Sequence, residues 1–351
     1  MKGLYICSFN PESNTNSYFN EWADNFRMQN FEIFNSFLDS PLNLKKLLNP
    51  FYYDLIIFGY SCSSNLSGRS KQVLKFFTKF SKATVIGFLQ NEFRNLPYLI
   101  KNYELLNVNI IVSQLPQKTA EKLYKGKINA KIVSVPHAMS SRHKIKKINH
   151  TKRTIDLGGR LANYAYYQGN INRSEVIPKF MQKIKKNKKI KIDFSTDPKK
   201  RFTSSNWINF LKSCRTTISS ESGSYFLQWN DSLRHKINKM TEINPKISFR
   251  YVFNNILKKS SSHVEASCIS SRHFDSIASG ACNVLVEGSY SNLLEPDVHY
   301  INLKSDLSNY KEVIEKIMDH KFTENIAKKA LKHAERFHTI EKRILDLIHN
   351  V

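Results

Sequence analysis

Short apolar runs separated by helix-length stretches dominate the N-terminal part of the chain. The runs are Leu4–Cys7, Asp54–Gly59, Ala83–Phe88, Val108–Val112 and Lys131–Val135. Runs that are apolar without alternation are typical of parallel strands buried on both faces of a sheet. Strand, helix and strand at this spacing predict a doubly wound α/β domain, whose ligands bind at the carboxyl ends of the strands.

A second set of strand and helix patterns follows a polar, strongly basic segment, Ser140–Arg153, which we interpret as an interdomain linker. The boundaries expected are therefore 1–139 for the first domain and 154–338 for the second, with a last helix at 339–351 that packs back on the first domain. The predicted elements of this part are strands at Thr154–Arg160, Lys189–Phe194, Thr216–Ser220 and Cys282–Val286, a turn at Glu221–Ser224, and helices at Arg173–Lys185, Trp207–Leu211, Tyr310–His320, Phe322–Phe337 and Ile340–Ile348.

Length and composition agree with two packed domains and add a strong charge bias. The chain has 351 residues, 41% of them hydrophobic, and a formal net charge of +25. This charge favours an anionic partner, although a low-GC genome rich in Lys, Asn and Ile codons would produce the same bias. Five scattered cysteines argue against a disulfide framework and against a zinc site, and no segment approaches 18 apolar residues. We expect a cytoplasmic protein that is neither exported nor membrane-spanning.

The stretch from Ser270 to Asp306 has the layout of a ligand site. Ser270 and Ser271 can cap a helix that ends at Gly280, and Arg272 and Asp275 lie in its first turns. A helix start with two serines and an arginine suits a diphosphate, and a carboxylate one turn further on suits the hydroxyls of a ribose. The alternative is a surface ion pair between Arg272 and Asp275.

The same stretch carries a resemblance to a known family. The residues concerned are Arg272-His273-Phe274-Asp275, Ala278-Ser279-Gly280, Glu287-Gly288-Ser289-Tyr290-Ser291, Leu294, Pro296, His299-Tyr300-Ile301, Leu303 and Asp306, with Glu221-Ser222-Gly223 and Arg153, Asp156, Gly158 and Arg160 upstream. This string resembles the C-terminal domain of GT-B glycosyltransferases that use nucleotide sugars, of the group 1-like, surface-polysaccharide type. The similarity covers most of residues 150 to 320.

The resemblance implies a GT-B architecture, in which two doubly wound Rossmann-like domains face each other across a cleft. It also implies a donor site. Its residues here would be Arg160, Glu221, Ser222, Gly223, Ser270, Ser271, Arg272 and Asp275. Asp275 stands where the family commonly has glutamate, and Ser267 stands where retaining members often carry a second glutamate, so the stereochemical outcome stays open.

Two residues are candidates for catalytic roles on the acceptor side. Glu92 follows the third predicted strand, and His137 follows the fifth at a corner that resembles the start of the GT-B linker. For Glu92, the alternatives are a surface ion pair with Arg94 or a helix cap. For His137, the alternative is a purely structural role.

These observations lead to the hypothesis of an enzyme that transfers a sugar from a nucleotide sugar to a glycan or a lipid-linked acceptor in cell-surface polysaccharide synthesis. We expect no metal and no other cofactor, because arginines and helix N-termini can neutralise the diphosphate.

The lysines from Lys183 to Lys191 would form a solvated basic edge or contact an anionic membrane at its inner face. Aromatic residues do not interleave with them, so nucleic acid is not the expected partner. The alternatives are a basic nucleic-acid-binding protein and a GT-B protein that binds without catalysis.

Overall fold

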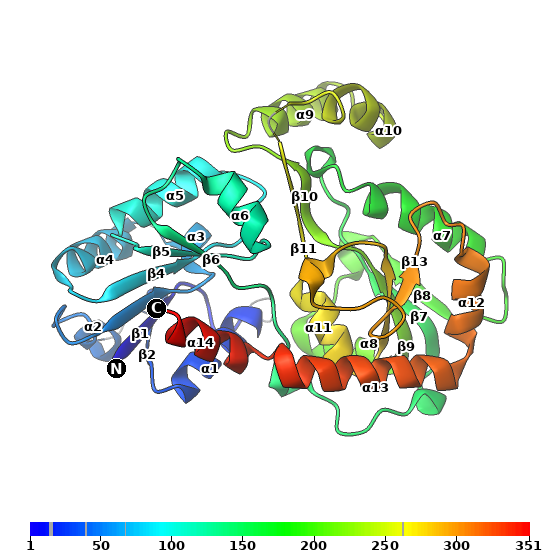
Figure 1. Ribbon diagram of the computed structural model, residues 1–351, viewed down its shortest axis with the longest axis horizontal. Coiled ribbons are helices and arrows are strands. Elements are labelled where there is room, and N and C mark those ends of the chain that lie inside the picture. The colour runs from blue at the N-terminus through cyan, green and yellow to red at the C-terminus, as the bar shows by residue number, and fades with distance from the viewer. Residues whose placement is uncertain (14–16, 39–40, 67, 262) are drawn as a thin grey trace. The chain divides into compact units, whose positions relative to one another are not determined.

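A computed structural model describes residues 1–13, 17–38, 41–66, 68–261 and 263–351 (Figure 1). The chain forms two compact units. Unit 1 contains Met1–Pro136, Gln228–Asp231 and Ile340–Val351, and unit 2 contains His137–Leu227 and Ser232–Thr339.

A six-stranded, wholly parallel sheet forms the centre of unit 1. Its order is β2-β1-β3-β4-β5-β6. The strands are β1 Gly3–Cys7, β2 Glu32–Asn35, β3 Leu55–Phe58, β4 Thr84–Phe88, β5 Ile110–Ser113 and β6 Lys131–Ser134. The five predicted strands are confirmed to within two residues, and β2 was missed because four residues at a sheet edge carry little pattern.

Helices cover both faces of this sheet. They are α1 Ser17–Met28, α2 Pro41–Lys45, α3 Cys62–Asn65, α4 Gly68–Phe80, α5 Leu96–Leu105, α6 Gln117–Tyr124 and α14 Ile340–His349. The order of the strands and the right-handed rule for parallel crossovers place α2, α4, α5 and α6 on one face and α1 on the other. The last helix, α14, packs against α1 and so belongs to unit 1.

Unit 2 has a five-stranded parallel sheet of order β13-β12-β9-β7-β8 and a separate antiparallel pair, β10 and β11. The strands are β7 Ile155–Arg160, β8 Ile192–Ser195, β9 Cys214–Ser219, β10 Ser222–Leu227, β11 Val264–Cys268, β12 Cys282–Val286 and β13 Ile301–Leu303. The helices are α7 Ile177–Ile184, α8 Ser204–Ser213, α9 Ser232–Ile243, α10 Phe249–Val252, α11 Ser271–Ala278, α12 Tyr310–Met318 and α13 His320–Phe337, with π-helical turns at Asn172–Val176 and Phe253–Leu257.

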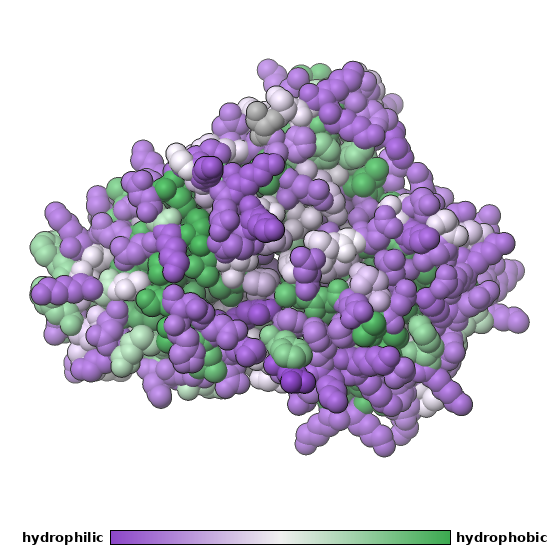
Figure 2. All heavy atoms as spheres, viewed as in Figure 1, coloured by the Kyte–Doolittle hydropathy of each residue, from purple (hydrophilic) through white to green (hydrophobic). Residues whose placement is uncertain are grey.

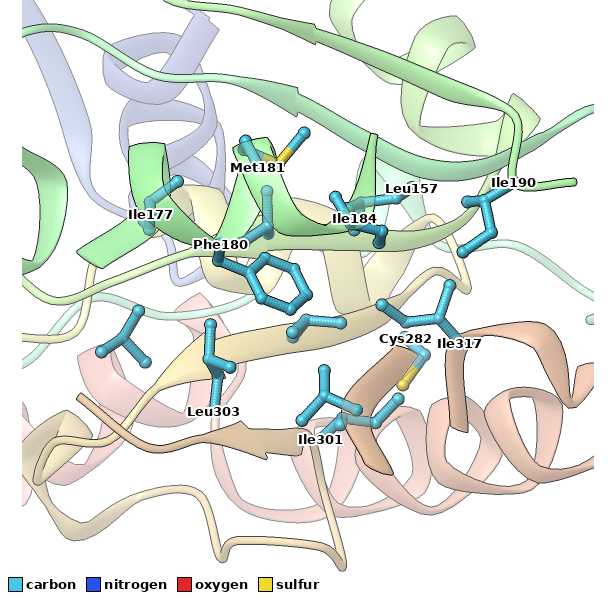
Figure 3. Close-up of a cluster of buried hydrophobic side chains, with 14 of the residues drawn as sticks. Leu157, Ile177, Phe180, Met181, Ile184, Ile190, Cys282, Ile301, Leu303 and Ile317 are labelled. Carbon is cyan, nitrogen blue, oxygen red and sulfur yellow. The ribbon is translucent and has the colours of Figure 1, made fainter. Parts of the chain in front are cut away.

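The core of unit 2 lies where α7, α12 and α13 cover the sheet. Ile177, Phe180 and Ile184 lie on one face of α7 and are completely buried, as are Ile301 and Leu303 of β13. Figure 3 shows Phe180 pointing from α7 toward the sheet. Burial of each such side chain contributes about 1.5–3 kcal/mol, which makes this sheet a rigid support for the loops at its carboxyl ends.

The segment Ser140–Arg153 is not a free linker. Its Lys144 pairs with Glu335 at 2.7 Å, and the amide of Ile145 donates to the carbonyl of Ala278 at 2.8 Å. His150 is buried, with its ring nitrogens 2.9 Å from Thr323 Oγ1 and 2.9 Å from the Gly280 carbonyl. A few buried anchors among the exposed lysines hold this segment, which we expected as a linker, to unit 2.

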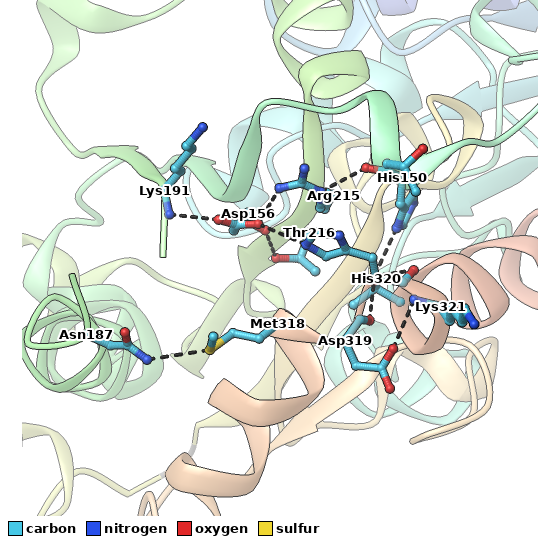
Figure 4. A network of polar contacts seen from close by, with 12 residues as sticks. His150, Asp156, Asn187, Lys191, Arg215, Thr216, Met318, Asp319, His320 and Lys321 are labelled. Atoms are coloured by element: carbon cyan, nitrogen blue, oxygen red, sulfur yellow. Dashed lines mark hydrogen bonds and ion pairs between the residues drawn. The ribbon is translucent and has the colours of Figure 1, made fainter. Parts of the chain in front are cut away.

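Two residues of the family-like string, Arg153 and Asp156, are structural. Arg153 donates to the carbonyls of Leu211, Cys214 and Ser279 at 3.1, 2.6 and 2.6 Å. Asp156 pairs with Arg215 and accepts a hydrogen bond from the Lys191 amide at 2.8 Å (Figure 4). Both lie at the amino ends of the strands, which is the edge opposite to that expected for a ligand.

Candidate functional site

Helix α11 begins with an unusual cap. Ser270 is the N-cap residue, with extended backbone angles, and its amide donates to Nδ1 of His273 at 3.0 Å. Burial lowers the pKa of His273 to about 3, so the imidazole is neutral and can accept this bond. The cap fixes the first turn of α11, whose positive dipole end attracts an anion.

Arg173 is the most informative side chain near this helix start. It lies in the π-helical turn before α7 and exposes 7% of its surface. Its guanidinium carbon lies 4.2 Å from the centre of the Tyr164 ring. Among the described residues, its Nε and Nη1 have no hydrogen-bond partner. A buried cation with unsatisfied donors is costly unless a bound anion completes it.

Arg272 of α11 lies in the electrostatic field of Arg173. Desolvation, followed by the charge of Arg173, lowers the pKa of the Arg272 guanidinium, although part of the side chain is exposed. Asp275 and Tyr164 act in the opposite direction, and Arg201 adds a further positive charge. A bound anion would offset the positive charges that act on Arg272, so the arrangement favours a diphosphate.

Asp275 lies one turn after Arg272 and is held by a tryptophan. Its Oδ2 accepts a hydrogen bond from Trp207 Nε1 of α8 at 3.1 Å. A carboxylate has about four lone-pair positions, so this bond orients Asp275 and still leaves capacity for ligand hydroxyls. Trp207 is partly exposed and positions this carboxylate.

Glu221 supports a loop and does not point to a ligand. It is buried, and its Oε1 accepts hydrogen bonds from Ser289 Oγ at 3.0 Å and from the Tyr290 amide at 2.7 Å. A Cβ at Gly288 would lie 2.5 Å from Glu221 Oε2, so a larger residue there would force the Glu221 side chain to move. These contacts hold three successive left-handed residues, Tyr290 to Asn292, whose conformation costs roughly 1–2 kcal/mol per residue.

Ser222 and Gly223 begin strand β10, so the predicted turn at Glu221–Ser224 was wrong. Ser222 pairs with Cys268 and Gly223 with Ser267 of β11. Gly223 has a φ of +94°, and a Cβ there would lie 2.1 Å from the carbonyl oxygen of Ala266. The glycine therefore serves close strand pairing, and the Ser222 hydroxyl accepts from Tyr164 Oη at 3.1 Å beside Arg173.

Arg160 is committed to its own unit. Its Nη2 lies 2.6 Å from Asp193 Oδ1, and its Nη1 donates to the Gly159 and Asp193 carbonyls. The guanidinium also stacks at 4.8 Å from the ring centre of Phe202 and 4.6 Å from that of Phe210. This geometry favours a structural role for Arg160, which has one nitrogen, Nε, without a partner among the described residues, whereas Arg173 has two.

Glu92 in unit 1 is a buried network residue. It accepts hydrogen bonds from Ser113 Oγ at 2.7 Å, the Gln114 amide at 2.7 Å and Tyr124 Oη at 2.6 Å. Burial raises the pKa of Glu92 to about 7, and the three donors limit the rise. Both carboxylate oxygens are occupied, which favours a role in holding the ends of β5 and α6 over a role as catalytic base.

The raised pKa of Glu92 predicts a measurable dependence of stability on pH. Because the folded pKa exceeds that of an unfolded glutamate, the folded state binds the proton more tightly, and stability falls as pH rises from about 4 to 8 by roughly 3 kcal/mol from this group. Urea unfolding of wild type and Glu92→Gln across this range tests it. Subtracting the unfolding free energies of the variant from those of wild type at each pH removes the contributions of the other titrating groups. A difference that does not change with pH would contradict the prediction.

His137 in unit 2 is partly buried, and desolvation lowers its pKa to about 4. The imidazole is therefore neutral at pH 7 and a weak base. A proton-transfer role favours a pKa nearer the working pH. The lowered pKa therefore gives no support to His137 as a catalyst.

Sequence reasoning missed Arg173 and Tyr164. Both lie in the segment that follows β7, and Arg173 was used only to mark the start of a helix. An arginine at the first turn after the first strand of a doubly wound domain was an available signal, because that turn binds phosphates in such folds. That its Nε and Nη1 have no partner among the described residues could not be read from the sequence.

Solved structures share this architecture over the whole chain. HepE of Anabaena in complex with UDP-glucose has a TM-score of 0.53 and 11% identity, with 100% of both chains covered. An alpha-glucosyltransferase in complex with UDP and a 13-mer DNA has a TM-score of 0.58 and 11% identity over 99% of both chains. The fold is GT-B. The architecture expected from the sequence is thereby confirmed.

Sucrose-phosphate synthase of Thermosynechococcus elongatus has the same GT-B fold, with a TM-score of 0.51 and 9% identity over 100% of this chain and 99% of that one. No family model matches the chain, and no curated protein matches it in sequence. Within the described ranges, no helix is long and apolar enough to cross a membrane. Those same ranges contain no group of three or more His, Cys, Asp or Glu residues able to hold a metal ion.

Proposed function

We propose that this GT-B protein is a glycosyltransferase that binds a nucleotide sugar in unit 2. The observation that carries the proposal is the buried guanidinium of Arg173 next to Arg272 and the start of α11. Its Nη2 donates to the Ser220 carbonyl at 3.5 Å, whereas its Nε and Nη1 have no partner among the described residues. Two arginines and a helix N-terminus supply the donors that a diphosphate requires. Asp275, oriented by Trp207, would accept hydrogen bonds from the ribose hydroxyls.

The structural neighbours support a nucleotide sugar as the ligand. HepE was solved with UDP-glucose, and the alpha-glucosyltransferase was solved with UDP. Uridine nucleotides are therefore the first ligands to test with this chain. The sugar is left to experiment.

The chemistry assigned to the arginines is stabilisation of the leaving group. In the transfer, the bond between the anomeric carbon and the β-phosphate oxygen breaks, and the acceptor oxygen forms a bond with that carbon while losing its proton. Negative charge grows on the departing nucleoside diphosphate. Arg173 and Arg272 would neutralise this charge, so we propose that no metal ion is needed.

The acceptor we propose is a glycan or a lipid-linked sugar used in cell-surface polysaccharide synthesis, in the cytoplasm or at the inner face of the membrane. The net charge of +25 supports an acidic or phosphate-linked acceptor. We assign no catalytic base.

Thermal denaturation with a panel of nucleotide sugars tests the proposal. A ligand at about 100 times its Kd should stabilise the protein by about 2.7 kcal/mol. Stabilisation by one nucleotide sugar, followed by release of free sugar and nucleoside diphosphate, would support an enzyme. Binding without release, with or without acceptor, would indicate a binding protein. If only DNA or RNA bound, with a steep salt dependence, the nucleic-acid alternative would replace the proposal.

A further inference from the structure

Helix α4 exposes an apolar stripe that its own unit does not cover. Val73, Phe76 and Phe80 repeat at helical spacing and expose 41%, 67% and 45% of their surfaces. The rings of Phe76 and Phe80 lie 4.7 Å apart. The inward face of the helix is formed by other residues, because Leu74 and Phe77 are buried. The exposed stripe is therefore a second apolar surface of α4, separate from the side that faces the core.

The stripe continues onto neighbouring segments of unit 1. Phe51 and Leu48, which follow α2, expose 63% and 77%, and Tyr98 of α5 exposes 60%. Beneath the surface, the buried ring of Tyr53 lies 6.3 Å from the buried ring of Phe77, so the segment after α2 packs against α4. Lys71 bonds Asn102 and so joins α4 to α5. We call this surface the α4 face.

The charge around the α4 face is mainly positive, although Glu32 contacts Tyr53 and Glu104 lies on α5. Residues 41–53 contain two lysines, and residues 68–82 contain four lysines and one arginine, whereas neither range contains an acidic residue. Lys75 and Lys79 form an exposed row on α4 beside the stripe. Figure 2 shows pale green hydrophobic spheres beside purple hydrophilic ones where Figure 1 places α4.

We infer that the α4 face docks on an anionic lipid bilayer. Aromatic side chains partition into the interfacial region of a bilayer, and lysines attract acidic headgroups while their methylene stems lie along apolar surface. A protein partner would need acidic groups across the whole rim, whereas a bilayer presents negative charge over any area. This inference goes beyond the proposed function. It rests on the proposed function in one respect: a membrane contact would place a lipid-linked acceptor beside the enzyme.

Vesicle flotation tests the inference with the full-length protein. Vesicles of phosphatidylcholine with about 30 mol% phosphatidylglycerol should carry the protein upward, and pure phosphatidylcholine should carry much less. Raising the salt from about 0.1 M to 0.5 M should weaken binding, because the Debye length shortens. Absence of wild-type binding to anionic vesicles would overturn the inference.

Two double variants locate the surface. Lys75→Glu with Lys79→Glu, and Phe76→Ser with Phe80→Ser, should each lower the partition coefficient at least about 10-fold. The matched control is Lys188→Glu with Lys189→Glu, which makes the same charge change at exposed positions in the lysine-rich turn of unit 2. An equal loss in the control would overturn the assignment to α4, as would full binding by the phenylalanine variant.

Donor binding separates this inference from the proposed function. The α4 substitutions lie in unit 1, and the control substitutions lie at exposed lysines of unit 2 outside the arginine cluster. Wild type and all three variants should therefore bind UDP equally and unfold at similar temperatures. Failure of every nucleotide sugar to bind would refute the proposed function and leave the vesicle result standing. Loss of flotation with intact UDP binding shows that a variant is folded and has lost only the membrane contact.

Discussion

Replacing Arg173 with methionine is expected to abolish donor binding without destabilising the protein. The methionine removes a buried cation whose Nε and Nη1 have no partner among the described residues. Removing that cation ends its desolvation cost, so the unfolding temperature should stay level or rise. The diphosphate would lose a buried, charge-assisted donor, and UDP affinity should fall by about 3 kcal/mol, or more than 100-fold. Calorimetry with UDP and thermal denaturation measure the two effects.

A second buried arginine provides the control. Arg153 of the same unit is as buried as Arg173, but its guanidinium donates to three backbone carbonyls. Arg153→Met should therefore destabilise the protein by about 2–5 kcal/mol, because three buried acceptors lose their partner. If Arg173→Met destabilised the protein as much as Arg153→Met and left UDP affinity unchanged, Arg173 would be a structural residue and the site assignment would fail.

Arg272→Ala is expected to lower both donor affinity and turnover. The charge that Arg272 would meet grows as the bond to the leaving diphosphate breaks, so its interaction is strongest in the transition state. A loss of about 10²-fold in kcat accompanies removal of one such donor in comparable sites. Steady-state kinetics with the best nucleotide sugar measure it. Arg336→Ala, an exposed arginine on α13, is the control, and unchanged kinetics in Arg272→Ala would contradict the model.

Asp275→Asn should separate binding from chemistry. Ribose hydroxyls take no part in the bond change, so KM for the donor should rise by about 10- to 100-fold while kcat stays within a few-fold. Asparagine keeps an oxygen that can accept the Trp207 indole bond, and stability should hardly change. A surface ion pair between Arg272 and Asp275 would instead predict that neither substitution alters the kinetics.

The membrane inference and the donor site concern different units. The two tests are therefore independent, since the first measures vesicle binding and the second measures nucleotide affinity. Together they would define an enzyme that works at a bilayer and takes its donor from solution.

The sequence by itself determined the central strands of the two parallel sheets, though not β2 and β13, and the helix that carries Arg272 and Asp275. Parallel strands buried on both faces must be apolar along their whole length, so runs such as Leu4–Cys7 and Cys282–Val286 identify themselves. Serine caps and Gly280, with a φ of +69°, likewise mark where α11 begins and ends.

Only the tertiary structure decided which polar residues remain available to a ligand. Arg153, Arg160 and Arg173 are the same residue type. Carbonyls nevertheless hold the first, Asp193 and two rings hold the second apart from its Nε, and the third has two unpartnered nitrogens among the described residues. Glu221 was expected at the donor and instead holds the loop after β12. Hydrogen-bond partners come from segments tens of residues away in the sequence. The local pattern can therefore place a side chain on a helix or strand, but it cannot identify the group to which that side chain is hydrogen-bonded.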